Sequence, residues 1–445
     1  MKTTTNIILI AILALWGVNT NAQNIQYLRP AGYDGLNVFE TKKSNDIEFE
    51  KLSVKIGADF AIQFQSVDQS NDMDNLTVIG GNVNLPTANL NFDVQLADGV
   101  RMHLRTFLSA KHHNETWVKG GYIQMDKLDF IKKDFLKSIM DVTTLRVGVD
   151  QLNYGDAHFR RSDNAMAIYN PFVGNYLMDA YTVEPFVEIT MQPKDYLIVA
   201  GISNGLLNPT VEKTITPWGA DNIVGEKDLK VTFYGKLGID REINEALRVR
   251  LTGSFISESG YNNGDHLYSG DRAGSRYYNL FNYNNSGDFT SSGDFSGRFT
   301  PGFKNNTSYQ INPFIQYKGL EFFGIYETSK GNKAEGNEKG SFTQLGTELL
   351  YRFGEQGQFY VAGRYNSVKG NADYAAGGTK PSDQEINRTN IGAGWFMTKN
   401  ILMKAEYVKQ SYNSDATAWS PNAWTPAILS GAEMNGMVIE AIISF

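Results

Sequence analysis

Cysteine is absent from the 445-residue sequence. Its absence excludes a disulfide framework, a thiolate nucleophile, a cysteine-ligated metal and a lipid-carrying cysteine after a cleavage site. An excess of basic residues is also lacking, because the formal net charge is -7. A broad positive surface is therefore not expected, and we predict that nucleic acid is not a partner.

Long apolar runs are scarce as well. The run from Ile7 to Val18 follows the basic Lys2 and precedes small residues that end at Ala22. It has roughly 12 residues, whereas a membrane helix needs about 20, so we predict a signal peptide over residues 1–22, cleaved after Ala22, rather than a retained anchor. No later segment is long and apolar enough for a membrane helix, so residence in a membrane would require strands.

Histidine is rare, and none of the five histidines lies in a His-Glu-x-x-His spacing. The sequence therefore shows no zinc-ligand set, and we predict neither a metal nor a cofactor. The string from Gly201 to Gly205 matches the Gly-x-Ser-x-Gly pattern, but that motif requires a following helix, and Pro209 continues a loop-like sequence instead. We predict no enzyme. A hydrolase embedded in a barrel, with His103 as its base, is the remaining catalytic alternative.

The sequence is rich in alternating segments. From Leu52 to Gln65, apolar residues alternate with polar ones over a length that suits a tilted membrane strand of about 9–11 residues better than a globular strand of about 5–6. A hairpin with an Asp98-Gly99 turn follows. Further segments repeat the pattern and bring the total to about 16 candidate strands: Tyr181–Met191, Tyr196–Ile202, Leu229–Ile239, Leu247–Phe255, Tyr309–Tyr317, Leu320–Tyr326, Leu345–Phe353, Phe359–Tyr365, Thr389–Met397 and Ile401–Tyr407.

The connections between these segments alternate between tight turns and long polar loops, such as the loop over Ser66–Pro86. Short periplasmic turns and long external loops are typical of outer-membrane barrels. One short-side connection, Asp129–Val142, has apolar residues at helical spacing and is predicted to be an amphipathic helix capping the rim. Two segments, Tyr196–Ile202 and Leu320–Tyr326, are apolar on both faces, which is compatible with a pore strand whose inner face is covered by an inward-folded loop.

These features predict an all-β fold, a transmembrane antiparallel β-barrel of about 16 strands. Residues 51–445 would form the barrel, and residues 23–50 a periplasmic or lumen-associated segment. The last strand ends at Phe445, and by alternation Ile443 faces lipid while Ser444 and Glu440 face inward. Aromatic residues near strand ends suit interfacial girdles: Trp117, Tyr122, Tyr317, Tyr326, Tyr351, Tyr365, Trp395 and Tyr407. A soluble extracellular lectin is the non-membrane alternative.

The loop over Leu152–Asp179, together with Arg29-Pro30 and Gly35–Glu40, resembles porin-like proteins of Bacteroidota outer membranes. The resemblance implies a porin-type barrel, contact with outer-membrane lipid and assembly as a homotrimer. It also implies that this third external loop folds inward and narrows a channel, with candidate constriction residues Asp156, His158, Arg160, Arg161 and Asp163. The alternative is an ordinary external loop whose ion pairs are solvated and contribute under about 1 kcal/mol each.

Strand alternation places a mixed set of charged side chains toward the lumen: Arg101, His103, Arg105, Arg146, Glu184, Glu188, Arg248 and Arg250. Because both signs are present, the ion preference is left open. The predicted function is passive diffusion of small hydrophilic solutes or ions through a water-filled channel. The alternative is a barrel that only anchors external loops for adhesion or assembly with a partner.

Overall fold

The computed structural model describes residues 25–44, 47–109, 116–205, 214–215, 221–222, 231–259, 267–268, 276–281, 295–414 and 428–445. The predicted signal peptide and Pro209 lie outside the described residues. None of the helices in the described part of the chain is long and apolar enough to cross a membrane.

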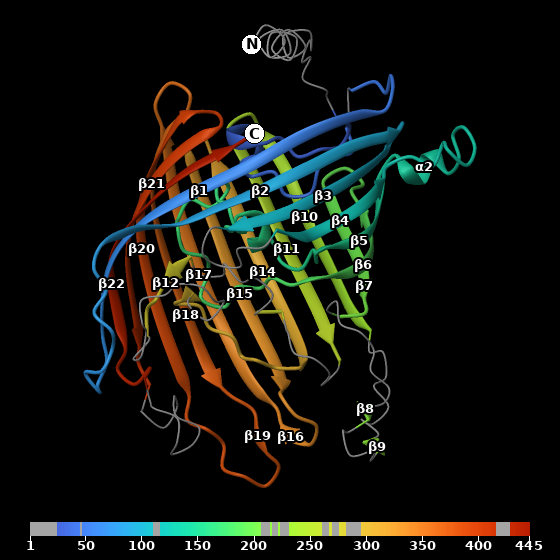
Figure 1. Ribbon diagram of the computed structural model, residues 1–445. Coiled ribbons are helices and arrows are strands. Elements are labelled where there is room, and N and C mark those ends of the chain that lie inside the picture. The colour runs from blue at the N-terminus through green and yellow to red at the C-terminus, as the bar shows by residue number, and fades with distance from the viewer. Residues whose placement is uncertain are drawn as a thin grey trace, which may run out of the picture.

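Sixteen of the described strands close into one antiparallel barrel (Figure 1), as the alternation predicted, with β1 paired to both β2 and the last strand, β22. Closure leaves no unpaired strand edge in the hydrocarbon, where each exposed backbone group would cost several kcal/mol. The barrel strands are β1 (Ser53–Ser70), β2 (Asn82–Ala97), β3 (Val100–Ser109), β4 (Trp117–Met125), β5 (Thr143–Gln151), β6 (Val183–Met191), β7 (Tyr196–Ser203), β10 (Thr232–Asn244), β11 (Leu247–Glu258), β14 (Asn305–Tyr317), β15 (Leu320–Asn332), β17 (Gly340–Phe353), β18 (Phe359–Asn371), β20 (Gln384–Thr398), β21 (Ile401–Tyr412) and β22 (Glu433–Ser444).

The remaining elements are short and lie in the connections. They are the strands β8 (Thr214–Ile215), β9 (Asp221–Asn222), β12 (Tyr277–Tyr278), β13 (Phe295–Ser296), β16 (Asn337–Glu338) and β19 (Tyr374–Ala375), and the helical turns η1 (Gly32–Gly35), α2 (Lys137–Met140) and η2 (Ala157–Phe159). The tight turns and the C-terminus lie at one rim, the upper rim in Figure 1, and the long loops leave the opposite rim. We call the rim with the tight turns the periplasmic rim, because short turns are expected on that side of an outer-membrane barrel.

The first external loop is shorter than predicted, because β1 and β2 extend into Ser66–Pro86. Pro86 is tolerated within β2 because the β1–β2 register shifts between Ala61 and Gln63, opposite this stretch, and Leu85 has a positive φ of 59°. A proline cannot donate to the ladder, but a bulge removes the need for that hydrogen bond.

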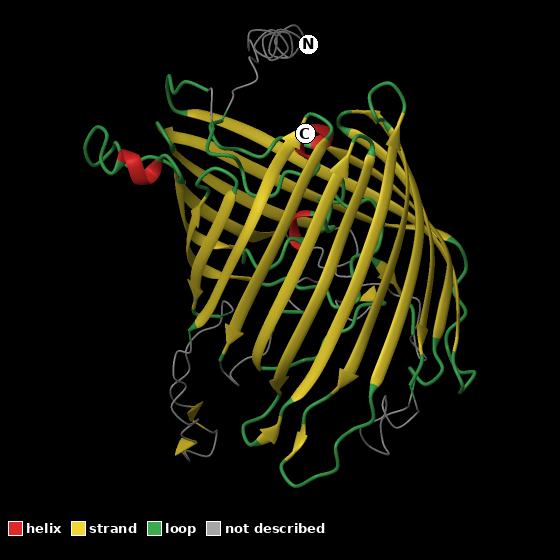
Figure 2. Ribbon diagram, turned by 180° about the vertical axis from the view of Figure 1, so that it is seen from behind, coloured by secondary structure: helices red, strands yellow, loops and turns green. Residues whose placement is uncertain are grey.

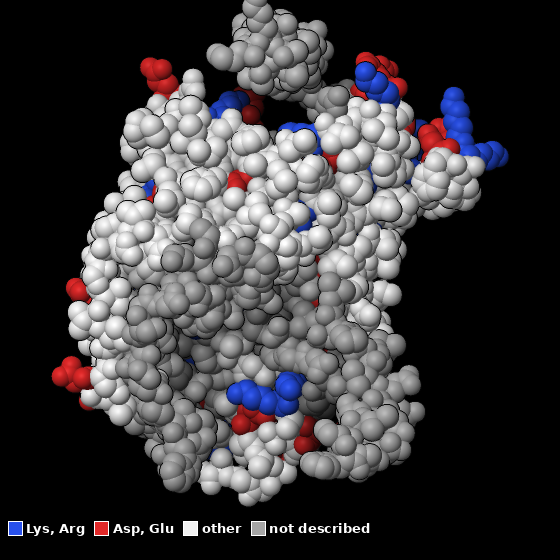
Figure 3. Space-filling model, in the orientation of Figure 1, with Lys and Arg blue, Asp and Glu red and all other residues white. Residues whose placement is uncertain are grey.

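The outer wall is an apolar belt. Charged side chains gather mainly toward the two ends of the wall on the face in Figure 3. Outward side chains include Val54, Val187, Leu237, Leu251, Leu349, Val361 and Ile391, all more than a third exposed. This surface suits lipid and is incompatible with the soluble lectin alternative.

Six of the eight predicted girdle residues face outward and are exposed: Tyr317, Tyr326, Tyr351, Tyr365, Trp395 and Tyr407. Tyr351, Phe353, Phe359 and Trp395 form a stacked row of rings near the periplasmic rim. The prediction for Tyr122 is wrong, since its ring lies inside the barrel, 5.2 Å from the ring of His103. Trp117 is not an exposed girdle residue either, because it pairs with the buried Phe107, and their rings lie 5.6 Å apart. The register irregularity between Arg105 and Thr106 places Trp117 and Tyr122 on the same face of β4.

The predicted helix over Asp129–Val142 is reduced to the single turn α2. Asp134 and Leu136 adopt left-handed φ angles of 58° and 53°, which an α-helix does not accommodate, so the residues before α2 form turns. The segment also does not cap the rim, because it projects sideways from the outer wall in both ribbon views (Figures 1 and 2).

The two strands with apolar inner faces are both part of the barrel. Leu197 and Val199 of β7 share a buried cluster with Tyr154 and Leu177 of the third external loop. On β15, Phe323 and Ile325 pack in a cluster with Tyr176 of that loop. The apolar inner faces are thus covered by an inward-folded loop, as predicted.

Candidate functional site in the barrel lumen

The third external loop, residues 152–182, lies inside the barrel (Figure 2). Nearly all of its residues are buried, including the five candidate constriction residues Asp156, His158, Arg160, Arg161 and Asp163. The structure therefore places this loop in the lumen and not in external solvent. The side chains predicted to face inward, listed above from Arg101 to Arg250, are buried or half-buried on the lumenal side of the wall.

Asp156 fixes the start of the loop to the wall formed by β10 and β11. Its carboxylate accepts hydrogen bonds from Lys236 Nζ, Arg250 Nε and Thr252 Oγ1, each at 2.8 Å. Glu40 lies on the same two cations, 3.1 Å from Lys236 Nζ and 2.8 Å from Arg250 Nη2. Two buried carboxylates and two buried cations thus neutralise one another, which is the condition for keeping charges in a low-dielectric lumen.

Arg160 connects the loop to a neighbouring part of the wall, formed by β15 and β17. Its Nη2 donates to Glu348 of β17 at 2.6 Å, and its Nη1 lies 3.5 Å from Glu321 of β15 and donates to Asn37. Arg364 of β18 also donates to Glu348, at 2.8 Å. The two acids counter the desolvation that would lower the pKa of Arg160 and hold that pKa above its usual value. Arg160 is therefore a buried, permanently charged anchor.

Arg161 and Asp163 make contacts within the loop and toward β3 and β4. Arg161 forms a two-point ion pair with Asp179, with Nη2 at 2.6 Å and Nε at 2.9 Å. Asp163 lies 3.5 Å from Lys119 Nζ and 3.8 Å from Arg105. The pair between Arg161 and Asp179 closes the loop on itself, while Asp163 faces the wall.

The far end of the loop is held by β17 and β21. Lys404 Nζ donates to the carbonyl oxygens of Ala167, Asn170 and Phe172 at 2.7 to 3.1 Å. Gly346 of β17 leaves the room that the loop needs, because a Cβ there would lie 2.8 Å from the ring of Tyr176. A glycine inside a strand often marks such a close approach. The loop therefore crosses the lumen with bonds to strands on several sides.

The N-terminal segment, residues 25–44, forms a second obstruction at the periplasmic mouth. Gln26 hydrogen-bonds to Gln95 of β2 and to the N–H of Gly99, both at 2.8 Å. Tyr33 N–H donates to the carbonyl of Lys399 in the β20–β21 turn at 2.7 Å. Lys43 donates to Asp126, also at 2.8 Å. These anchors lie at separate positions around the rim, so the segment spans the mouth.

Alternation on the strands could have identified Lys236, Arg364 and Lys404 as inward-facing, although the sequence analysis did not single them out. The sequence analysis had no signal for the contribution of the connection between β11 and β14, residues 259–304. Arg276 and Tyr277 from that loop reach Glu440 and Glu406 on the inner wall. Only the closed barrel brings these residues together, because they are separated by more than a hundred positions.

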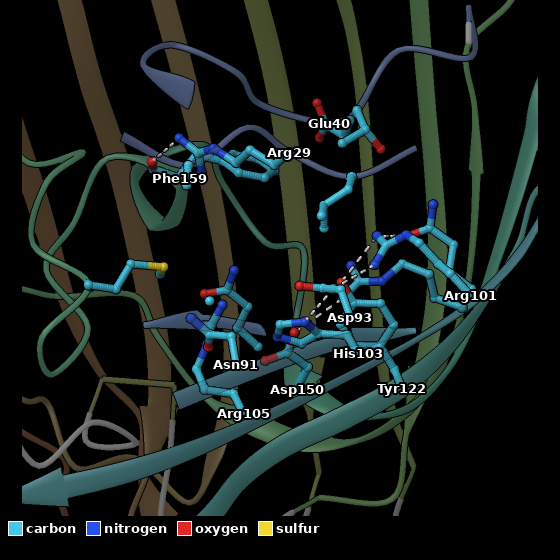
Figure 4. A pocket seen from close by; sticks show the side chains of 18 of the residues that line it. Arg29, Glu40, Asn91, Asp93, Arg101, His103, Arg105, Tyr122, Asp150 and Phe159 are labelled. Carbon is cyan, nitrogen blue, oxygen red and sulfur yellow. Dashed lines mark hydrogen bonds and ion pairs between the residues drawn. The ribbon is translucent and has the colours of Figure 1, made fainter. Parts of the chain in front are cut away.

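A cavity of about 200 Å³ remains between the two inward segments and the wall of β1 to β6. In Figure 4, Arg29, Glu40 and Phe159 lie on one side of it, and Asp93, Arg101, His103, Arg105 and Asp150 lie on the other. A wider vestibule of about 830 Å³ opens beside the N-terminal segment and the β6–β7 turn.

The cavity wall carries charges of both signs that are largely paired. His103 Nδ1 lies 2.9 Å from Asp93, and Arg101 donates to Gln124 at 2.6 Å. Arg105 Nε donates to Asn91 at 2.8 Å. Such a lining offers charged and neutral hydrogen-bond donors and acceptors to a small hydrophilic solute.

Two further features bear on possible catalysis: the Gly-x-Ser-x-Gly string, which contains Ser203, and the buried His158 of the third loop. Ser203 Oγ donates to Glu184 and accepts from the N–H of Gly205, and its hydrogen-bond partners in the described residues include no histidine. Burial lowers the pKa of His158 to about 3, so this side chain is neutral at physiological pH. In the described ranges, no group of three or more His, Cys, Asp or Glu side chains is placed to hold a metal ion.

The ion pairs of Glu40 with Arg250 and Lys236 predict that the attachment of the N-terminal segment depends on pH. Burial would raise the pKa of Glu40, but Arg250 and Lys236 outweigh it and lower the pKa from 4.5 to about 2. A depressed pKa contributes stability above pH 4.5 that is lost as the pH falls toward 2. We expect the N-terminal segment to loosen in this window, and conductance in planar bilayers to rise between pH 5 and pH 3. The variant Glu40→Gln should already conduct more at pH 7 and show a smaller rise, whereas an equal rise would assign the effect to other groups.

A scan against protein-family models gave no match, and a search of curated proteins also gave none. Among solved structures, the outer membrane channel DcaP of Acinetobacter baumannii aligns with a TM-score of 0.51 at 10% identity, covering 89% of this chain and 98% of that one. The anion-selective porin from Comamonas acidovorans aligns with a TM-score of 0.49 at 10% identity, covering 89% and 100%. OmpT, an outer membrane protein of Vibrio cholerae, aligns with a TM-score of 0.48 at 9% identity, covering 90% and 99%. At these identities the DcaP match bears on the fold alone, and it agrees with a closed porin-type barrel.

Proposed function

We propose that this chain is an outer-membrane porin, a narrow channel for passive diffusion of small hydrophilic solutes or ions. The observation that carries the proposal is the third external loop, which crosses the lumen of a closed barrel and is bonded to strands on several sides. A barrel that served only as an anchor would not need a charged loop that crosses the lumen and is held by hydrogen bonds and ion pairs to the wall. The cavity and the vestibule mark where a solute would pass.

The further parts of the proposal follow from this role. The chain would be exported with residues 1–22 as its signal peptide, cleaved after Ala22, and would reside in the outer membrane in contact with lipid. Residues 23–50 would form the lumen-associated segment and residues 51–445 the barrel. We propose that the protein belongs with the porin-like barrels of Bacteroidota, assembles as a homotrimer, uses no cofactor and has no enzymatic activity.

The direct test is the conductance of purified mature protein in planar bilayers, measured alone and with Arg160→Ala and Arg161→Ala combined. Stable open steps would support the channel. The double change removes two positive charges from the lumen beside Glu348, Glu321 and Asp179, so we expect the reversal potential in a KCl gradient to shift toward cation selectivity. The matched control removes two exposed cations outside the lumen, Lys132→Ala with Lys133→Ala, and should not shift it.

Two results would contradict the proposal in different ways. A folded barrel without conductance would favour the loop-presenting anchor, in which the external loops bind a partner. Open steps with an unchanged reversal potential in the double variant would support a channel. They would also show that Arg160 and Arg161 do not influence the conducting path.

A further inference from the structure

The β4–β5 connection (residues 126–142) carries a group of exposed apolar side chains outside the barrel belt. Phe130 and Ile131 are each 58% exposed, and Phe135, Leu136 and Ile139 are exposed as well. Both ribbon views show this connection projecting sideways from the periplasmic end of the wall, away from the lumen (Figures 1 and 2). Removing the exposed apolar area of these five side chains from water would be favourable.

The projection is an ordered structure. Asp134 N–H donates to Asp129 Oδ1 at 3.0 Å, and Met140 N–H donates to the carbonyl of Leu136 at 2.9 Å. Its base is anchored by the buried side chains of Leu128 and Met140. The apolar side chains are therefore presented at a fixed place beside the rim.

This place continues the lipid-facing belt. On the flanking strands, outward Ile123 pairs with Val147, and Met125 pairs with Leu145 at the strand ends. β4 and β5 have nine residues each. At about 3.3 Å per residue and a tilt of about 45°, such a strand spans only about 21 Å of a belt that is about 25 Å tall. The connection adds apolar surface beside a short stretch of wall.

The charges of the connection suit a phospholipid headgroup region. Lys132, Lys133 and Lys137 alternate with the apolar residues, and charged side chains gather at this projection in Figure 3. Lysine stems can cover apolar surface while the ammonium groups reach the headgroups. Asp129, Asp134 and Asp141 balance the three lysines, which favours zwitterionic lipid over a purely anionic surface.

We propose that the β4–β5 connection inserts its apolar side chains into the headgroup and acyl boundary of the periplasmic leaflet. The occupant of this surface is phospholipid, and the connection acts as a lateral anchor that compensates for the short wall of β4 and β5. The inference requires a membrane-embedded barrel but does not depend on the barrel conducting solutes.

The test uses the absence of native cysteine, which makes any introduced label unique. Nitroxide-labelled Ile131→Cys is reconstituted as full mature protein in vesicles of phosphatidylethanolamine and phosphatidylglycerol, and collision with oxygen and with a water-soluble nickel chelate is measured. Ile391→Cys, exposed to lipid in the middle of β20, and Glu355→Cys, exposed in the β17–β18 turn, are the lipid and water references. Phe135→Cys repeats the measurement at a second position.

We expect the oxygen-to-nickel collision ratio at Ile131 and Phe135 to be severalfold higher than at Glu355 and closer to that at Ile391. A ratio equal to that at Glu355 would place the connection in water and overturn the proposal. Low collision with both reagents, together with spin–spin broadening between labels, would show that a second copy of the chain covers the surface and would also overturn it. The Ile391 reference verifies insertion in each sample, so a failed reconstitution is recognised separately.

Discussion

Replacing Asp156 with alanine is expected to release the third loop and to raise the single-channel conductance severalfold. The change leaves Lys236 and Arg250 buried with one fewer carboxylate. Removing one partner from a buried ion pair typically costs about 3–5 kcal/mol when the remaining charge is uncompensated. Glu40, which stays paired with both cations, offsets part of this cost. The change therefore destabilises the packed conformation of the third loop, whereas the backbone hydrogen bonds of the barrel wall are retained.

Asp156→Asn tests the electrostatic part of this expectation. The amide can accept one of the hydrogen bonds from Lys236, Arg250 and Thr252 but carries no charge, so an intermediate conductance is expected. The matched control is Asp141→Ala, which removes an exposed acid 2.7 Å from Lys137 in an exposed pair outside the lumen. Such a pair contributes under about 1 kcal/mol. An Asp156→Ala variant with the conductance of the parent protein would show that the third loop does not limit the channel.

Deleting residues 25–44 is the second change with a large expected effect. This segment spans the periplasmic mouth and contributes Glu40 and Asn37 to the partners of Arg250 and Arg160. Its removal should widen the mouth and also weaken the third loop, because both cations lose an acceptor. We expect higher conductance than in the parent protein and more frequent conductance fluctuations, measured in the same planar bilayers.

The control for the deletion is Asp34→Ala, which breaks only the exposed pair with Lys399 at 2.8 Å and leaves the segment in place. Its conductance should match that of the parent. The deletion should leave the electrophoretic heat shift of the folded barrel intact, since β1 begins at Ser53 and pairs with β2 and β22 independently of the segment. Unchanged conductance in a folded deletion variant would mean that the constriction lies elsewhere.

Much of the fold could be predicted because a barrel wall is a local pattern. The alternation from Leu52 onward predicted which side chains face lipid and which face the lumen. In the last strand, Ile443 is exposed on the outer face and Ser444 is buried, as alternation assigned them. Errors occurred where the pattern was interrupted. Tyr122 turned inward across a register irregularity, and the expected helix over Asp129–Val142 was broken by left-handed residues.

The candidate site was only partly accessible from sequence. The third loop was singled out by its density of charge and aromatic residues and by its resemblance to porin-like proteins, and its five candidate residues are buried in the lumen. Their partners were not predictable, since Arg160 meets Glu348 across 188 positions and Asp156 meets Arg250 across 94.

The sequence by itself determined the wall of this protein: two-residue periodicity decides which side chains meet lipid and which meet the lumen, strand by strand, without reference to distant residues. Only the tertiary structure decided what fills the lumen. Which of the long segments folds inward depends on charges supplied by many strands at once, such as Lys236 with Glu40 and Asp156, or Lys404 with the carbonyls of the third loop. Those charges become neighbours only when the barrel closes, because burying any one of them alone would be unfavourable.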